Sequence, residues 1–197
     1  MSFSPAADRN KAPILRELQR LLPATACVLE IASGTGQHAE HFAAACSGWT
    51  WQPTEADAAY LPDIDARCRS HANVRPAMRL DVLATPWPVD AAAYDAMYCA
   101  NLLHIAPQPV CPALMRGAAR HLRSGGTLLL YGPYRVDGQP TAPSNEAFNA
   151  DLKARDPAWG LRLLSDVQRE AETAGLQLRE TVPMPANNLL LAFACTR

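Results

Sequence analysis

The sequence predicts a three-layer α/β fold, with a seven-stranded, mostly parallel sheet, an antiparallel terminal strand and helices on both faces. Segments with strand character alternate with segments of helical periodicity along most of the chain. The continuous Leu128–Leu130 run is typical of a strand that is buried on both faces, as in a parallel sheet. Only a short turn separates the last two strands, which predicts an antiparallel hairpin at the sheet edge.

Length and composition indicate a single domain over residues 1–197. The 197 residues are 49% hydrophobic and 19% charged, which is enough for one α/β core. A formal net charge of −1 gives no electrostatic reason to expect nucleic acid or an acidic membrane as a partner. No run approaches the ~20 apolar residues of a membrane span, and the N-terminus lacks the pattern of a signal peptide. The six cysteines form no C-x-x-C pair, so we expect reduced thiols, a cytoplasmic location and no metal site.

The chain begins with a polar stretch and an amphipathic helix. Apolar residues at helical spacing predict a helix over Ala12–Leu22, which Pro23 ends. The polar cluster Asp8–Lys11 stands just before this helix. It is either a solvated cap or a place from which Arg9 reaches a ligand carboxylate with its forked guanidinium.

The stretch Val28–Gly36 is the centre of the prediction: a buried strand, then a glycine-rich turn that opens a helix over Gln37–Cys46. Such a turn brings backbone N–H groups and a positive helix end close to a ligand. A dinucleotide would place its pyrophosphate there, but Glu30, four residues before Gly34, would repel it. An acid at that position suits the ammonium and sulfonium groups of S-adenosylmethionine. The alternative is an ordinary strand–turn–helix with a solvated glutamate.

Two acidic residues follow the second predicted strand, Trp49–Thr54. Glu55 stands at the end of this strand, where a carboxylate can accept hydrogen bonds from both hydroxyls of a ribose. Asp57 is the rival acid, and we expect it to cap a helix over Ala58–Arg69.

The third predicted strand, Asn73–Leu80, is followed by Asp81 and Val82. Asp81 either accepts a hydrogen bond from an adenine amino group or forms the turn before Leu83. Both interpretations place a carboxylate just past the end of a strand.

The fourth predicted strand, Tyr94–Asn101, ends where ligands collect in an open α/β sheet. Asn101 and His104 stand there, three residues apart and therefore on one face of a helical turn. His104 is a candidate general base near neutral pH, and Asn101 is its candidate catalytic neighbour. The alternative is that His104 is a hydrogen-bonded structural residue.

The second half of the chain supplies the remaining elements and a candidate acceptor site. Helices are predicted over Pro109–Leu122, Asn145–Asp156 and Ser165–Ala174, and strands over Thr127–Gly132, Leu176–Val182 and Leu189–Cys195. Aromatic side chains with a few polar ones dominate near the predicted strand ends, as suits a small ligand. The candidate acceptor-binding residues are Tyr131, Tyr134, Asn145, Phe148, Trp159, Arg162 and Asn187. Arg162 is the candidate partner of a carboxylate, and the alternative for the aromatic residues is burial in the core.

The stretch E-I-A-S-G-T-G at Glu30–Gly36 resembles motif I of class I S-adenosylmethionine-dependent methyltransferases, E/D-x-x-x-G-x-G. The order of the predicted elements also resembles their Rossmann-like fold. Further stretches, among them D-R-N-K-x-P-I-L, N-L-L-H-I, Y-G-P-Y and M-P-A-N-N, resemble the uncharacterised methyltransferase-like DUF938 family over nearly the whole chain.

The resemblance implies S-adenosylmethionine as cofactor and S-adenosylhomocysteine as product, with residues 1–24 packing over the cofactor site. Ala32 departs from the commoner glycine, and Glu55 from the aspartate that this family more often has. The cofactor-binding residues expected from the motifs and the resemblance together are Arg9, Glu30, Ala32, Gly34, Gly36, Glu55, Asp81, Val82 and Asn101.

The predicted function is methyl transfer to a small-molecule acceptor, whose identity the sequence does not indicate. The alternative from another class is a non-catalytic protein that binds S-adenosylmethionine or serves as a scaffold on a methyltransferase fold. A nicotinamide oxidoreductase is disfavoured by Glu30 and by the incomplete glycine pattern.

Overall fold

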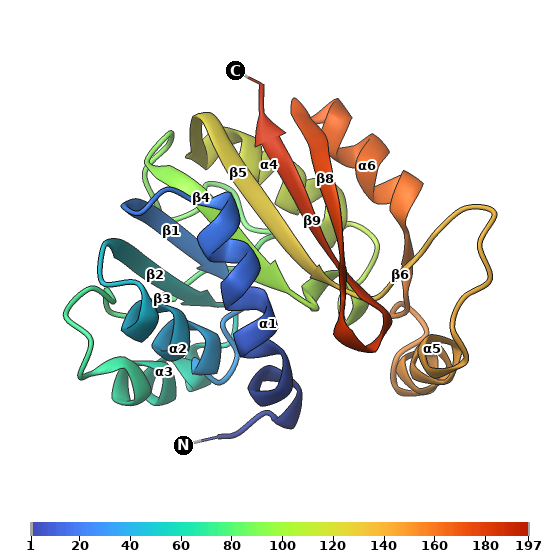
Figure 1. Ribbon diagram of the computed structural model, residues 1–197, viewed down its shortest axis with the longest axis horizontal. Helices are drawn as coiled ribbons and strands as arrows, with labels where there is room; N and C mark the ends of the chain where they lie inside the picture. The colour runs from blue at the N-terminus through green and yellow to red at the C-terminus, as the bar shows by residue number, and fades with distance from the viewer. Residues whose placement is uncertain (1, 197) are drawn as a thin grey trace.

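The structure is a computed structural model that describes residues 2–196, so Met1 and Arg197, the ends of the predicted domain, lie outside the described residues. It confirms a seven-stranded sheet, in the order β3-β2-β1-β4-β5-β9-β8 (Figure 1). Neighbouring strands from β3 to β5 are parallel, and β9 runs antiparallel to both β5 and β8. The strands are β1 (Ala26–Ile31), β2 (Trp49–Glu55), β3 (Met78–Arg79), β4 (Tyr94–Ala100), β5 (Leu122–Gly132), β8 (Leu176–Met184) and β9 (Asn188–Cys195).

The helices cover both faces of the sheet and so form a three-layer architecture (Figure 1). The alternating side chains of β5 face the two layers: Leu129 belongs to the cluster with Phe42, and Leu128 and Leu130 to the cluster with Leu114. One face carries α1 (Pro5–Leu21), α2 (Gln37–Ala45) and α3 (Leu61–Cys68), and the other carries α4 (Val110–His121) and α6 (Leu164–Thr173).

The remaining short elements lie around the carboxyl ends of the parallel strands. α5 (Pro143–Arg155) stands apart from the sheet, on the side of β6 (Figure 1). β6 (Tyr134–Arg135) and β7 (Arg162–Leu163) pair in parallel with each other. The 3₁₀ turns are η1 (Ala58–Tyr60), η2 (Leu102–His104) and η3 (Pro185–Asn187).

The N-terminal helix begins at Pro5 rather than near Ala12, because Ser4 caps it. The Ser4 Oγ accepts a hydrogen bond from the Ala7 N–H at 3.3 Å. The polar cluster Asp8–Lys11 is therefore part of α1, and the expectation that it caps the helix from outside was wrong.

The third strand is shorter than predicted and keeps only Met78–Arg79. Pro76 has no N–H to donate to a strand ladder, which limits pairing upstream of β3. The neighbouring β2 makes only an isolated bridge there, between Trp51 and Val74.

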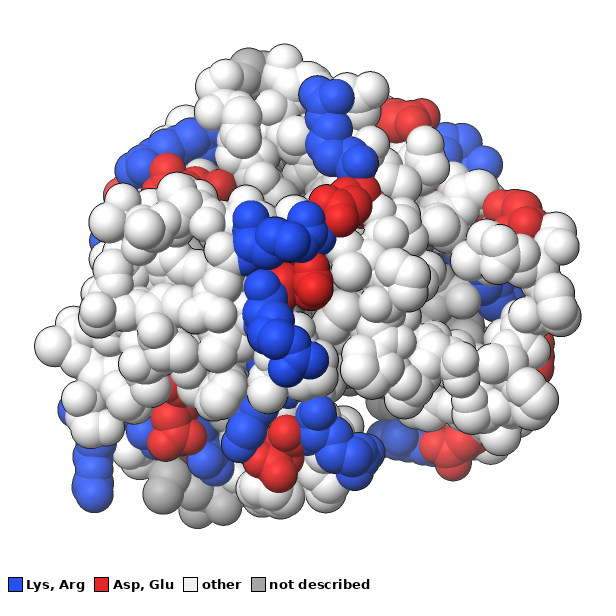
Figure 2. All heavy atoms as spheres, viewed as in Figure 1, with Lys and Arg blue, Asp and Glu red and all other residues white. Residues whose placement is uncertain are grey.

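Charges of both signs are interleaved on the side of the molecule where α1 is exposed (Figure 2). Along α1, Lys11 pairs with Asp8, and Arg20 pairs with both Glu17 and Glu180. Such exposed pairs contribute little to stability. Among residues 2–196 no helix is long and apolar enough to cross a membrane.

Candidate active site

The glycine turn after β1 holds Ala32, Gly34 and Gly36 with left-handed φ angles of 58°, 56° and 73°. A Cβ atom added to Gly34 would meet nothing within 4 Å, whereas one added to Gly36 would lie 3.2 Å from the Ile64 Cα atom. Gly34 therefore borders open space, and Gly36 allows α3 to pack closely.

Glu55 lies at the end of β2 and contacts this turn. Its carboxylate accepts hydrogen bonds from the Gly34 N–H at 2.9 Å and from the Ala56 N–H at 2.8 Å. A carboxylate has about four acceptor positions, so two remain for ligand hydroxyls. The rival Asp57 accepts from the Ala59 N–H at 2.9 Å and caps η1, as predicted.

The Glu30 carboxylate is buried next to the glycine turn. It accepts hydrogen bonds from the Ser33 hydroxyl and the Trp51 indole N–H, both at 2.9 Å, and the residue is 2% exposed. Burial raises the pKa of Glu30 to about 7, although these two hydrogen bonds act in the opposite direction. These two contacts support the turn, and a direct contact of Glu30 with a cationic ligand stays a prediction.

Two further predicted residues stand at the carboxyl edge of the parallel strands. Asp81 is exposed after β3, and its Oδ1 accepts from the Leu83 N–H at 2.9 Å, so it forms the predicted turn while keeping further acceptor positions. Val82 beside it is buried. Asn101 follows β4 with a φ of 60°, and its N–H donates to the Tyr131 carbonyl at 2.8 Å.

A cavity of about 590 Å³ adjoins Asn101. It brings together five of the predicted residues, namely Arg9, Asn101, Tyr131, Asn145 and Phe148. The prediction missed Asn10, Pro13, Pro133, Ala186 and Asn188, which also line it. Asn10 carried a signal in the sequence, because it stands four residues before Ile14 and eight before Leu18, on the buried face of α1.

Four candidate acceptor-binding residues do not line this cavity. The Arg162 guanidinium is held by backbone carbonyls, at 2.8 Å from the Leu103 oxygen and also on Ala106. Trp159 packs against the Arg155 guanidinium, 5.2 Å from the ring centroid. Tyr134 is buried at 6% exposure, and Asn187 accepts through its carbonyl from the Asn145 amide at 2.9 Å, which holds the β8–β9 turn. Tertiary contacts hold each of these four residues outside this cavity, and their contact with an acceptor stays a prediction.

His104 is fully buried and lies beneath Asn101 rather than in the cavity. Its ring packs edge-on against Tyr134, with centroids 5.0 Å apart, and a Cβ on Gly132 would lie 2.3 Å from His104 Nε2. Neither ring nitrogen has a hydrogen-bond partner among the described residues. Burial, aided by the charge of Arg162, lowers the pKa of His104 to about 3. This environment does not favour the predicted general base, and the hydrogen-bonded structural alternative also differs from what the structure shows.

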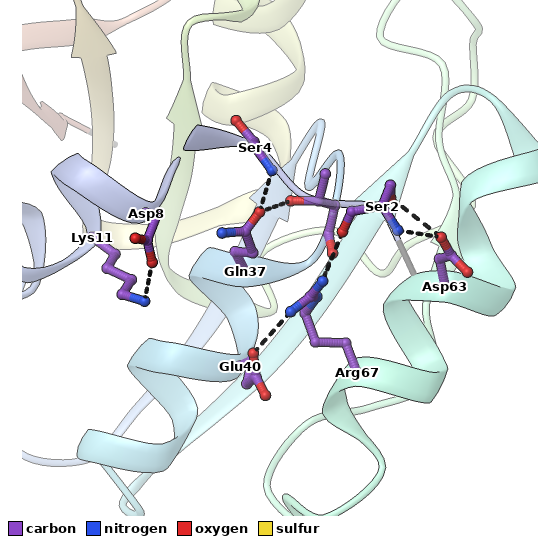
Figure 3. Close-up of polar contacts among 9 residues, drawn as sticks. Ser2, Ser4, Asp8, Lys11, Gln37, Glu40, Asp63 and Arg67 are labelled. Carbon is purple, nitrogen blue, oxygen red and sulfur yellow. Dashed lines mark hydrogen bonds and ion pairs between the residues drawn. The ribbon is translucent and has the colours of Figure 1, made fainter. Parts of the chain in front are cut away.

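The chain before α1 crosses the start of α2 and is tied to it (Figure 3). The Ser4 N–H donates to the Gln37 side chain at 2.6 Å. The Arg67 guanidinium, from α3, donates to the Ser2 carbonyl at 2.7 Å and to the Thr35 carbonyl in the glycine turn at 2.8 Å. These contacts connect the N-terminal segment to the turn, and the packing of residues 1–24 over the cofactor site stays a prediction.

We expect Arg67→Met to lower the free energy of unfolding by about 2 kcal/mol, because it leaves two carbonyls without their charged donor. Urea unfolding measures this loss, and amide hydrogen exchange locates it at the start of α1. Arg69→Met, at an exposed position on the same helix end, is the matched control and should change stability by less than about 0.5 kcal/mol. Equal stability of the two variants would contradict the tethering role.

Comparison with known proteins gives a family and a fold. A family model described as "Protein of unknown function (DUF938)" matches residues 1–195. CalO1, a methyltransferase of calicheamicin biosynthesis solved with S-adenosylhomocysteine, superimposes with a TM-score of 0.78 at 17% identity, over 95% of this chain and 54% of its own. Human N-acetylserotonin methyltransferase, solved with S-adenosylmethionine, gives 0.77 at 12% identity, over 98% and 53%.

A third match is an O-methyltransferase family 2 protein from Planctomyces limnophilus, solved with apigenin. It gives a TM-score of 0.77 at 16% identity, over 96% of this chain and 59% of its own. The match covers 53–59% of the residues of these three structures. The chain thus spans little more than half of their length. The likeness confirms the predicted class I methyltransferase fold.

Proposed function

Because the chain belongs to the DUF938 family, whose description assigns no function, we propose its activity from the geometry of the site. The activity is S-adenosylmethionine-dependent methyl transfer to a small-molecule acceptor. One observation carries the proposal: Gly34, Glu55 and Asn101 lie along one edge of the sheet, and a cavity with apolar walls begins at Asn101.

The residues along this edge fit S-adenosylmethionine. The open space at Gly34 admits the methionine part against the backbone of the turn, and Ala32 and Gly36 shape that turn. The free acceptor positions of Glu55 suit the ribose hydroxyls, and Asp81 with Val82 suits the adenine edge. Arg9, which lines the cavity from α1, is placed to pair with a carboxylate.

The chain contributes mainly positioning to the reaction. When bound, the cofactor would supply a methyl group on a sulfonium; the acceptor nucleophile would bond to this methyl carbon in line, with S-adenosylhomocysteine as the leaving group. Asn101 stands between the cofactor edge and the cavity, so it orients the two reactants toward each other. Tyr131, Phe148 and the prolines of the cavity wall hold the acceptor body and exclude water.

We expect Gly34→Trp to abolish binding of S-adenosylmethionine and S-adenosylhomocysteine while the protein stays folded. The indole would project into the open space beside the turn, and the left-handed φ adds only about 1–2 kcal/mol of strain. Gly125→Trp is the matched control, because Gly125 has a φ of 74° and also nothing within 4 Å of an added Cβ. Calorimetric titration of both variants and the unaltered protein measures the effect. Failure of the unaltered protein to bind either compound at millimolar concentration would overturn the proposal.

A methylation screen with labelled cofactor against a metabolite extract tests the acceptor. A labelled small molecule that forms with the unaltered protein but not with Gly34→Trp supports the proposed reaction. Cofactor binding without any labelled product would favour the non-catalytic alternative, and a labelled protein or nucleic acid would contradict the small-molecule acceptor.

A further inference from the structure

A second cavity, of about 660 Å³, is lined by residues of α4, α6 and the β6–β7 pair. Among residues 2–196 it has no lining residue in common with the cavity at Asn101. Its volume is within the range of small-ligand sites. The apolar side chains of its wall are Pro109, Pro112, Leu161, Leu163 and Val167. Cys111 also lines it, and burial raises the pKa of this thiol to about 11, so the thiol is neutral at pH 7.

Five charged side chains line this second cavity, and two ion pairs account for three of them. Arg169 pairs with Asp166 on α6, and Arg135 pairs with Glu146 at 2.9 Å. The remaining two, which make no ion pair among the described residues, are Arg162 and Glu170. The cavity therefore holds one cation and one anion without a charged partner.

The Arg162 guanidinium is held by backbone carbonyls but keeps donors for a ligand. Its Nε donates to the Leu103 carbonyl at 2.8 Å, and its Nη2 donates to the carbonyls of Ala106 and Ala158. Within residues 2–196 the Nη1 atom has no hydrogen-bond partner, and it is not enclosed. Burial lowers the pKa of Arg162, yet a guanidinium stays charged. A cation partly removed from water thus lacks a carboxylate, which an anionic ligand group would supply.

Glu170 contributes the opposite charge to the wall of the second cavity. It is half-buried on α6, and its side chain has no hydrogen bond in the described part of the chain. α6 begins at Leu164, six positions earlier, so Glu170 stands roughly 9 Å further along the helix axis. Because Cα–Cβ bonds tilt toward the helix N-terminus, the carboxylate leans back toward the end of α6 that Arg162 precedes. A ligand that meets both charges must therefore carry its own two charges several ångströms apart.

We propose that the second cavity binds a small zwitterion whose carboxylate and ammonium groups stand at opposite ends of a short apolar chain. The carboxylate pairs with Arg162 through charge-assisted hydrogen bonds, and the ammonium donates to Glu170. The apolar chain lies against the prolines and leucines of the wall. A ligand with a single charge leaves the opposite protein charge unpaired and binds more weakly. This site is separate from the one proposed for methyl transfer.

The test uses 6-aminohexanoate as the probe, with hexanoate and hexylamine as analogues that each carry only one of its two charges. Each compound is titrated at pH 7 into the unaltered protein and followed by backbone amide NMR shifts. We expect 6-aminohexanoate to shift amides of β7 and α6. It should bind roughly tenfold or more tightly than either analogue, as for one added charged hydrogen bond.

Glu170→Gln should weaken 6-aminohexanoate roughly tenfold, to the affinity of hexanoate, and should not weaken hexanoate itself. Glu172→Gln, at an exposed position on the same helix, is the matched control and should bind 6-aminohexanoate normally. Arg162→Lys keeps a positive charge but has a single nitrogen, which the carbonyls of Leu103 and Ala106 occupy. It should weaken hexanoate and 6-aminohexanoate but not hexylamine. If Arg162→Lys does not fold, Glu170→Gln decides the matter alone.

Three results would overturn the proposal. They are no shift with millimolar 6-aminohexanoate, an unchanged affinity for it in Glu170→Gln, or shifts confined to the glycine turn and the cavity at Asn101. The titrations contain no S-adenosylmethionine, so a failure of cofactor binding affects only the proposed function and leaves this test intact.

Discussion

The variant His104→Ala is expected to lower the free energy of unfolding by about 2–4 kcal/mol, because it empties a fully buried position that packs against Tyr134. Gly132→Ala is expected to lower it by about 1–3 kcal/mol, since its methyl group would lie 2.3 Å from His104 Nε2. In the double variant the methyl group enters the space that the imidazole leaves. The combined loss should therefore be smaller than the sum by at least about 1 kcal/mol.

Chemical denaturation of the two single variants and the double variant measures this coupling. Gly117→Ala is the matched control, because its methyl group would clash with Trp87 at 2.1 Å instead of with His104. Its effect should add to that of His104→Ala without compensation. Additive losses for Gly132→Ala and His104→Ala would show that the ring moves aside and would contradict the packing described here.

The role of His104 as a general base can be tested once an acceptor is found. We expect His104→Gln to keep turnover within about tenfold for each folded molecule. A group with a pKa of about 3 has little driving force to remove a proton, and the ring does not line the cavity. A loss of the ~10²–10⁴-fold typical of a general base, with cofactor affinity unchanged, would instead establish the base predicted from the sequence.

Replacing Glu30 with glutamine is expected to stabilise the protein by about 3 kcal/mol at pH 8 and to change its stability little at pH 4. Burial raises the pKa of the Glu30 carboxyl from 4.5 to about 7. One pKa unit corresponds to about 1.4 kcal/mol. Glutamine keeps an oxygen that can accept from Trp51 and Ser33 but carries no charge to bury.

The sign of this effect follows from proton linkage. Between about pH 4.5 and pH 7 the folded protein keeps the Glu30 proton, whereas the unfolded chain has released it. The stability that Glu30 contributes in its protonated form is therefore lost as the pH rises through this interval. His38 and His104, whose pKa values are lowered to about 4 and 3, give the opposite slope below pH 6.5. They are present in both proteins, so the difference between variant and unaltered protein isolates Glu30.

Urea unfolding at a series of pH values between 4 and 8 measures this difference. Glu40→Gln, at a half-buried position on α2 where the carboxylate pairs with Arg67, is the control and should give no gain in stability at pH 8. A constant difference for Glu30→Gln across the range would contradict the raised pKa. The same variant tests the site, because a tenfold or larger loss of S-adenosylmethionine affinity would support the direct ligand contact that the sequence predicted for Glu30.

The fold followed from short-range features of the sequence. The alternation of strand and helix segments, the leucine run of β5 and the terminal hairpin all depend on residues close together in the chain, and the sheet that they predicted is confirmed. The cap formed by Asp57 was also a short-range prediction, because the N–H that it binds lies two residues away. The position of Glu55 beside the glycine turn could also be predicted, because neighbouring parallel strands end at the same edge of a sheet.

Tertiary packing decided which residues line the cavity. Arg162 and Asn10 are both polar residues near predicted elements, and only Arg162 was predicted to bind the acceptor. The folded chain surrounds Arg162 with carbonyls from Leu103 and Ala106, whereas the docking of α1 on α2 brings Asn10 to His38 and to the cavity. These contacts join residues 28 to 59 positions apart, beyond the reach of any local pattern.

By itself the sequence determined the layers, the mostly parallel sheet and its antiparallel terminal hairpin, because hydrophobic periodicity and turn chemistry act over a few residues. Only the tertiary structure decided that Glu30 is buried against Ser33 and Trp51 and that His104 is enclosed against Tyr134 and Gly132. The physical reason is that the protonation and accessibility of a side chain depend on how completely other elements surround it. That enclosure arises only when the helices close over the sheet.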